Sequence, residues 1–224
     1  SKSEAETTAE EIISLGRQVR FWQADLSDPV QVQNGMNHFA EAGVFPQIVV
    51  HSASMFEGRR LLEDLAQTNH QEVNAAMMQV NLMTPILIDQ SFLNYWNDKQ
   101  TDQGIKPKSN HTDRHIIYFL DQRVAQNQGQ RHIYSITKKA LTAHMEQMAV
   151  EYGKLVKVNA IAPGLILPPP GEGIAHLEKL THRTPIQTYG GGKDIARAFD
   201  YLINSTFVHG QIMYCDGGQH LLSE

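Results

Sequence analysis

The stretch His115-Ile-Ile-Tyr-Phe-Leu-Asp121 joins an apolar run of strand length to a carboxylate. Tyr134-Ser-Ile-Thr-Lys138 comes next, near the start of a segment with helical apolar spacing, His132 to Tyr152. A second run rich in β-branched residues, Lys157 to Ile161, follows that segment. Strand, helix and strand in this order predict a βαβ unit whose two strands lie parallel in one sheet.

The same alternation continues on both sides of this unit. Helical spacing and helix-capping residues predict further helices at Glu4 to Leu15, Val30 to Ala42, about Asn69 to Phe92, and Asp194 to Asn204. Short apolar runs predict further strands at Val19 to Ala24, Gln47 to His51 and Gln211 to Tyr214. The sequence therefore predicts an α/β fold with a doubly wound parallel sheet, formed by a single domain over residues 1–224.

Composition excludes several classes of protein. The chain has 224 residues, with 19 Lys and Arg against 24 Asp and Glu and a net charge of −5, which argues against nucleic-acid binding. One Cys excludes an internal disulfide, and the 11 His show no metal-ligand spacing, so we expect no metal. No apolar run approaches the roughly 18 residues of a membrane span, so we expect no membrane partner and a cytoplasmic location.

Tyr134 and Lys138 stand four residues apart, on one face of the predicted helix. A nearby ammonium lowers the pKa of a phenol, and a phenol tuned in this way exchanges protons readily. Asp121 ends the preceding strand, where its carboxylate could orient the tyrosine or cap the loop. Asn81 lies inside a predicted helix, where its amide would need buried partners or would face solvent.

Three motifs in order resemble the short-chain dehydrogenase/reductase family over essentially the whole chain. They are the Tyr-xxx-Lys pair, Asn-Ala-Ile-Ala-Pro-Gly at 159–164 and Tyr-Cys-Asp-Gly-Gly at 214–218. Most members have Ser where this chain has Asp121, and the Asp is similar to the pteridine reductase and bacterial dihydromonapterin reductase branch. His51-Ser-Ala-Ser-Met-Phe56 also resembles that branch's Asn-Asn-Ala-Ser-x-aromatic pattern, although His51-Ser52 replaces the Asn pair.

The resemblance implies an NADPH-dependent pterin reductase of tetrahydrobiopterin or folate metabolism. Tyr134 would transfer the proton, Lys138 would lower its pKa and bind the nicotinamide ribose, Asp121 would assist protonation of the pterin, and Asn81 would hold a helix bend and a water chain. The implied substrate contacts are Ser54, Phe56, Asp121, Tyr134 and Leu167, with 167–176 as a mobile loop. The implied cofactor contacts are Ser1, Lys2, Ser3, Asp25, Leu26, Ser52, Ala53, Ser54, Tyr134, Lys138, Pro163, Gly164, Leu165 and Ile166.

The chain departs from the family at its beginning. The family's first strand, its glycine-rich turn and its second strand have no counterpart here, so we expect the domain to be N-terminally incomplete by roughly 30 to 40 residues. Ser1 to Ser3 would then follow the second strand, where relatives bind the 2′-phosphate of NADPH. Relatives also form tetramers through the helix that carries Tyr134 and the helix before it, so we expect a homotetramer.

Two other functions stay open from the sequence. A carbonyl reductase of the same family would act on a 3-oxoacyl group or a sugar ketone, although such enzymes hold the substrate oxygen with a Ser where this chain has Asp121. A binding protein that keeps the fold without turnover would not need Tyr134, Lys138 and Asn81 together.

Overall fold

The computed structural model describes residues 2–43, 46–56, 70–102, 113–127, 131–169 and 171–222. Its centre is a four-stranded sheet in the order β1-β2-β3-β4, in which every neighbouring pair is parallel. The strands are β1 (Ile48–His51), β2 (His115–Phe119), β3 (Lys157–Pro163) and β4 (Ile212–Cys215). Each of them lies within two residues of its predicted bounds, and the predicted parallel α/β architecture is confirmed.

Helices account for most of the remaining described chain. α6 has the predicted bounds, and the helix predicted from about Asn69 is longer than expected, because it runs on to Asp102. The α-helices are α1 (Lys2–Ser14), α2 (Pro29–Glu41), α4 (His70–Met78), α5 (Thr84–Asp102), α6 (His132–Tyr152), α7 (Ile174–Leu180) and α8 (Gly192–Asn204). The shorter helical turns are η1 (Gln79–Met83), η2 (Gln122–Ala125), η3 (Thr181–Arg183) and η4 (Gln219–Leu221).

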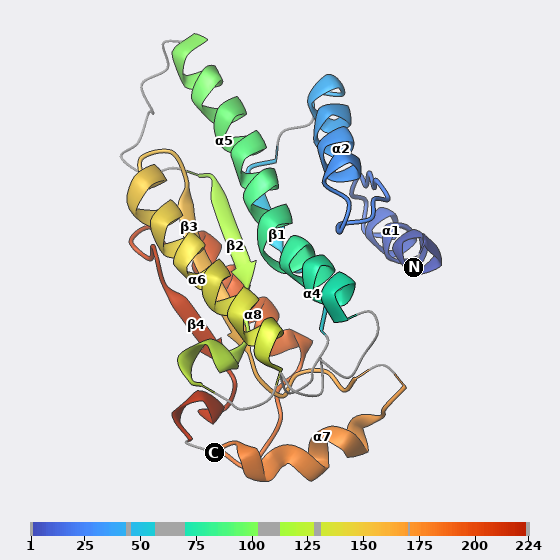
Figure 1. Ribbon diagram of the computed structural model, residues 1–224, viewed down its shortest axis with the longest axis vertical. Helices are drawn as coiled ribbons and strands as arrows, with labels where there is room; N and C mark the ends of the chain where they lie inside the picture. The colour runs from blue at the N-terminus through green and yellow to red at the C-terminus, as the bar shows by residue number, and fades with distance from the viewer. Residues whose placement is uncertain are drawn as a thin grey trace.

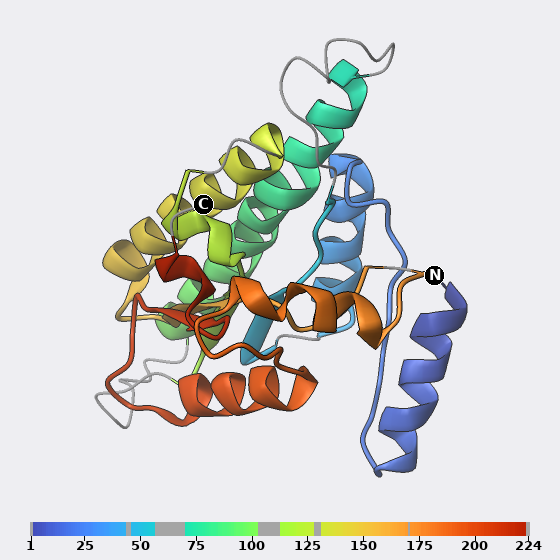
Figure 2. The same ribbon diagram turned by 90° about the horizontal axis from the view of Figure 1, so that it is seen from below.

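The helices cover both faces of the sheet (Figures 1 and 2). α5 and α6 pack on one face, where the buried side chains of Trp96 and Met145 join those of β2 and β3. α8 packs on the other face, where Leu202 lies against Ile117 and Ile161. Because β2 and β3 are buried on both faces, their β-branched runs show little polar alternation. No helix in the described part of the chain is long and apolar enough to cross a membrane.

The strand predicted at Val19 to Ala24 is absent, and that prediction was wrong. A strand requires a hydrogen-bonded neighbour, and the described residues offer none to this segment. Phe21 and Trp22 stay half-exposed, and the Trp22 ring stacks on His38 of α2 at 4.5 Å between centroids. The segment is therefore a connection between α1 and α2, and both helices lie on the β1 side of the sheet (Figure 1).

A wider turn interrupts the long helix before the sheet's second strand. Gln79–Met83 forms a π-helical turn, η1, between α4 and α5. Such turns insert a residue into the helical ladder and occur frequently at functional sites. Asn81, at the centre of this turn, is 1% exposed. The helix bend that the family resemblance implied at Asn81 therefore has a structural counterpart.

Candidate active site

The candidate site lies at the carboxyl edge of the sheet, where ligands of open parallel sheets bind. β1 ends at His51 and leads to residues 52–56, and β2 ends at Phe119 just before Asp121. α6 begins at the same edge and carries Tyr134 and Lys138 in its first two turns. The topology thus brings together residues that are 80 or more positions apart in the sequence, as from Ser54 to Tyr134.

Tyr134 and Asp121 are in direct contact. The Tyr134 hydroxyl donates to Asp121 Oδ2 at 2.9 Å, and the tyrosine is 5% exposed. Asp121 also accepts from the backbone N–H of Arg123 at 2.9 Å and from the Arg123 guanidinium at 2.9 and 3.1 Å. Asp121 caps the short helix η2 through this backbone bond, as expected for one of its two roles. Its role in orienting Tyr134 for catalysis stays a prediction.

The pKa of Tyr134 is raised above its ordinary value. Burial is the largest cause, because it disfavours the phenolate, and the charge of Asp121 and its hydrogen bond act in the same direction. The charge of Arg123 and a hydrogen bond with Ser54 oppose the rise without cancelling it. We had expected Lys138 to lower this pKa. In the structure burial and the adjacent carboxylate raise this pKa, and Lys138 is not among the groups that shift it, so the expected lowering is wrong.

Lys138 lies beneath Tyr134 and is 3% exposed. Its ammonium donates to the carbonyl oxygen of Phe119 at 2.9 Å and lies 5.9 Å from the centroid of the Tyr134 ring. Burial lowers the pKa of Lys138 to about 8, although the charge of Asp121 partly opposes that shift. The lysine therefore changes charge close to physiological pH.

Asn81 ties three elements together through both ends of its amide. Its Oδ1 accepts from the Met55 N–H at 2.7 Å and from the Ser54 hydroxyl at 3.2 Å. Its Nδ2 donates to the Met55 carbonyl at 2.9 Å and to the Thr137 hydroxyl at 3.1 Å. Because this buried amide is fully satisfied by the segment after β1 and by α6, it positions both of them relative to η1.

Phe56 lies against Tyr134 on the outer side of the site. The two rings meet edge to face, with centroids 4.8 Å apart, and half of the Phe56 surface is exposed. The guanidinium carbon of Arg131 lies 4.1 Å from the centroid of the Phe56 ring. A half-exposed aromatic ring beside the phenol could stack on a flat ligand, as the resemblance implied.

The cofactor contacts expected near β1 form two groups. Ser52, Ala53 and Ser54 are exposed at the carboxyl end of β1, where a ligand could reach them. Asp25 and Leu26 lie in the turn before α2, where Asp25 accepts two hydrogen bonds from Ser27, which lower its pKa. The Leu26 carbonyl accepts from Thr84 at 2.8 Å, which ties this turn to the start of α5, next to η1.

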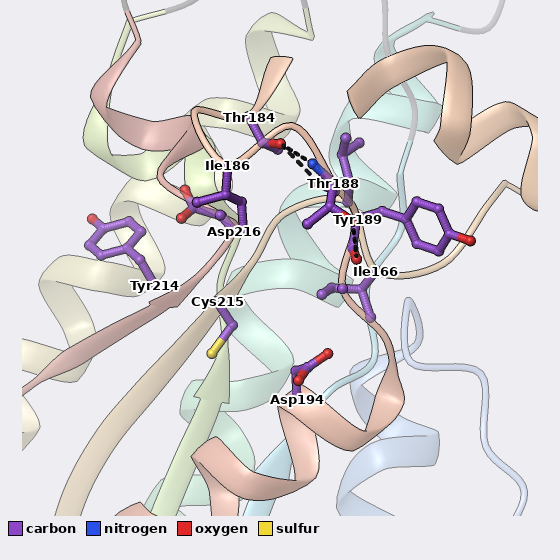
Figure 3. A pocket seen from close by; sticks show the side chains of 12 residues that line it. Ile166, Thr184, Ile186, Thr188, Tyr189, Asp194, Tyr214, Cys215 and Asp216 are labelled. Carbon is purple, nitrogen blue, oxygen red and sulfur yellow. Dashed lines mark hydrogen bonds between the residues drawn. The ribbon is translucent and has the colours of Figure 1, made fainter. Parts of the chain in front are cut away.

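The contacts expected after β3 lie at the edge of a cavity of about 450 Å³ (Figure 3). Leu165 and Ile166 line it together with Asp194 and Tyr214, whereas Tyr134 and Lys138 do not. Pro163 ends β3, and a Cβ on the following residue, Gly164, would lie 2.6 Å from Cβ of Asp216. The chain passes that close because residue 164 is a glycine.

The structure says less about the other expected contacts, which are Leu167, the segment 167–176 and Ser1 to Ser3. Leu167 is 77% exposed, and the segment 167–176 ends inside α7, whose last four residues extend past it. Lys2 and Ser3 belong to α1, but their side chains lie outside the described residues, as does the whole of Ser1. The expected 2′-phosphate contacts at Ser1, Lys2 and Ser3 therefore stay a prediction.

Sequence reasoning missed three residues of the site: Arg123, Arg131 and Thr137. Arg123 holds Asp121, Arg131 covers Phe56, and Thr137 accepts from Asn81. The position of Thr137, between Tyr134 and Lys138, was a usable signal, since it lies one turn along the same helix from Tyr134. The two arginines resemble ordinary solvated residues in the sequence.

Comparison with known proteins gives sequence relatives over most of the chain. Dihydromonapterin reductase from Shigella boydii is 29% identical over 173 residues, which is 77% of this chain and 66% of the relative. The protein of the same name from Escherichia coli strain K12 is 28% identical over the same shares. The matched region thus spans slightly less than two thirds of the length of these curated relatives.

Solved structures share the fold. FolM alternative dihydrofolate reductase 1 from Brucella suis, in complex with NADP, has a TM-score of 0.81 and 24% identity, covering 100% of this chain and 83% of that one. Gluconate 5-dehydrogenase from Burkholderia cenocepacia, in complex with NADP and tartrate, has a TM-score of 0.80 and 21% identity, covering 100% and 84%. The family model described as enoyl-(acyl carrier protein) reductase matches residues 1–220, and the chain belongs to this family, within the short-chain dehydrogenases/reductases.

Proposed function

We propose that this protein reduces a dihydropterin to a tetrahydropterin with NADPH. The observation that carries the proposal is the 2.9 Å hydrogen bond from the Tyr134 hydroxyl to Asp121, at the strand end where most members of the family have Ser. The half-exposed Phe56 ring beside Tyr134 supports it, because a flat bicyclic ring can stack there. Relatives named dihydromonapterin reductase support it from sequence.

The residues at this edge of the sheet fit the nicotinamide end of the cofactor. Tyr134 and Lys138 lie side by side at the start of α6, and Ser52 and Ala53 are exposed at the carboxyl end of β1, on the same edge of the sheet. We assign these residues and the loop Pro163 to Ile166 to cofactor binding. When bound, NADPH supplies the hydride.

The proton comes from the protein's own residues. Reduction of a C=N bond adds a hydride at carbon and a proton at nitrogen, so the site needs a protonated donor. We assign this role to Tyr134, because its hydroxyl is protonated at neutral pH and its ring lies against Phe56, where the pterin would stack. Asp121, held by Arg123, accepts the Tyr134 proton in a hydrogen bond, and the hydroxyl must turn from this carboxylate to the pterin nitrogen to give the proton up. The Lys138 ammonium then compensates the charge left on the phenol until a solvent proton replaces the one given up.

Replacing Asp121 by serine tests this assignment. We expect Asp121→Ser to lower kcat for dihydropterin at least about tenfold, since it removes the acceptor of Tyr134 and the partner of Arg123. The KM for NADPH should change little. NADPH oxidation is followed at 340 nm, with a dihydropterin and a 3-oxoacyl thioester offered separately, and the exposed Asp200→Ser serves as the matched control.

Two results would contradict the proposal. If the wild-type protein turns over the thioester and no dihydropterin, it is a carbonyl reductase. If it binds NADPH and reduces neither compound, it is a binding protein. Full dihydropterin turnover in Asp121→Ser would remove Asp121 from the mechanism while leaving the substrate assignment in place.

The charge of Lys138 predicts a pH dependence. The pKa of this lysine is lowered to about 8, so its ammonium is charged below that pH and neutral above it. We expect kcat/KM to fall as the pH rises through about 8, because the site then loses the charge that compensates the Tyr134 phenolate. The pH profile of NADPH-dependent reduction measures this, and a rate that stays level up to pH 10 would contradict it.

The lowered pKa of Lys138 also predicts that the stability of the folded protein depends on pH. Its pKa in the folded protein lies below the unfolded value of 10.5, so the unfolded chain binds the proton more tightly. The folded protein should therefore gain stability as the pH rises from about 8 toward about 10.5, and Lys138→Met should abolish this gain. Lys139→Met is the matched control, because it removes the next lysine along the chain, whose ammonium donates to Asn127 in an exposed hydrogen bond.

Two further expectations stay predictions. The resemblance implies a homotetramer, and the exposed apolar side chains of Ile136 and Val150 on α6 would suit contact with another subunit. A cytoplasmic location agrees with a pterin substrate and NADPH.

A further inference from the structure

Arg131 stands at a strained position beside the candidate site. It is the residue before α6, three positions ahead of Tyr134, and its φ of 57° lies in the left-handed region that L-residues rarely adopt. Gln187 is the other described non-glycine residue with a positive φ. Backbone strain of this kind persists where the surrounding structure holds it, often at ligand sites.

The guanidinium of Arg131 has no acceptor in the described part of the chain. Its guanidinium carbon lies 4.1 Å from the centroid of the Phe56 ring, and the charges of Asp121 and Arg123 act on it from the same site. Arg123, by contrast, is paired with Asp121 at 2.9 Å, so that carboxylate already has its cation. Toward the described residues, Arg131 therefore keeps its hydrogen-bond donors unused, while Phe56 fixes the plane of the group.

The balance of charge favours an anion at this place. Asp121 and Arg123 cancel one another, and Lys138 and Arg131 leave the site positive, although the chain as a whole carries −5. A planar guanidinium binds a carboxylate through two parallel hydrogen bonds, which is stronger than its bond to a neutral carbonyl. Partial burial of Arg131 strengthens such a bond further.

We propose that Arg131 binds a carboxylate of the substrate, so that the site prefers pterins that carry an acidic arm. The inference rests on the proposed function and specifies its substrate class. Arg131 is then a specificity-determining residue. Its guanidinium lies over the Phe56 ring, which is half-exposed, so the arm of the substrate reaches it while the pterin ring lies against the exposed part of Phe56 near Tyr134.

The test compares an acidic and a neutral substrate on the same variants. In the wild type we expect a higher kcat/KM for dihydrofolate than for dihydrobiopterin. Arg131→Gln should lower kcat/KM for dihydrofolate at least about tenfold, mainly through KM, and change it less than about threefold for dihydrobiopterin. Arg131→Lys should restore part of the loss, because it restores the charge without the planar fork.

Controls separate this inference from general damage. Arg197→Gln, at a side chain that is 81% exposed on α8, should leave both substrates unchanged. The KM for NADPH should also be unchanged in Arg131→Gln. Equal losses for both substrates, or no loss for either, would overturn the role of Arg131 while dihydropterin reduction still stood. A wild-type protein that reduces neither substrate would overturn the proposed function, and this inference with it.

Discussion

Tyr134→Phe lowers kcat for dihydropterin reduction by at least about a hundredfold, within the range that general acid catalysis supplies. The change removes one hydroxyl and keeps the ring, so the contact with Phe56 is retained. The hydrogen bond to Asp121 at 2.9 Å is lost, which should cost about 1 kcal/mol of stability. Single-turnover NADPH oxidation, with thermal unfolding in parallel, measures both effects.

The control for this variant is a tyrosine that lies outside the site. Tyr201 on α8 is 54% exposed, and Tyr201→Phe should leave turnover unchanged. Tyr134→Phe should still bind NADPH, because Lys138 and the segment after β1 are untouched. Turnover within threefold of wild type would show that another group provides the proton.

The fold was largely predictable because its strands and helices carry their own signals. β2 and β3 are apolar and β-branched, and α6 begins and ends where its apolar spacing does. Asp28 caps α2 through the N–H groups of Val30 and Gln31, as Asp before Pro at a helix start suggests. The strand prediction at Val19 to Ala24 was wrong for a different reason. A strand forms only beside a hydrogen-bonded partner, and the local sequence does not show whether a partner is present.

The site residues that share a helix face or follow a strand could be predicted from the sequence. Properties that depend on contacts between distant parts of the chain could not. Tyr134 and Lys138 follow from the i, i+4 spacing, and Asp121 from its place at a strand end. The pKa of Tyr134 could not be predicted in this way, because it depends on how deeply the ring is buried and on which charge lies closer. Arg131 near Phe56 is a contact across 75 positions, and the arginine looks like an ordinary solvated residue in the sequence.

The sequence also did not predict a buried carboxylate that lies apart from the proposed catalytic residues. Asp89 on α5 is 0% exposed. It accepts from His51 Nε2 at 2.7 Å, from His144 Nε2 at 2.9 Å and from the Tyr118 hydroxyl. These partners come from β1, α6 and β2, so the carboxylate joins the helices on one face to two strands of the sheet.

Asp89→Ala should therefore destabilise the protein by about 3–5 kcal/mol, the cost of breaking a buried charge pair. The buried His51 and Tyr118 and the part-buried His144 lose their acceptor at once, and the two buried groups keep their desolvation penalty. For a chain of this size the melting temperature should fall by about 10 °C. Asp89→Asn should cost less, because it keeps an oxygen acceptor and the volume, and the exposed Asp200→Ala should stay within about 0.5 kcal/mol of wild type.

The pH dependence of that loss identifies the charge of Asp89 as its cause. Burial alone would raise the pKa of Asp89, but the charge of His51 and the hydrogen bonds from His144, His51 and Tyr118 outweigh it and lower the pKa below 3.8. The unfolded chain then takes up this proton first, so the stability from ionised Asp89 is present above about pH 4 and is lost as the pH falls through the folded-state value. The difference in unfolding free energy between wild type and Asp89→Ala, measured by urea denaturation from pH 7 to pH 3, should be constant at first and shrink at the acid end. A difference that stays the same down to pH 3 would mean that the cavity, and not the lost charge, accounts for the effect.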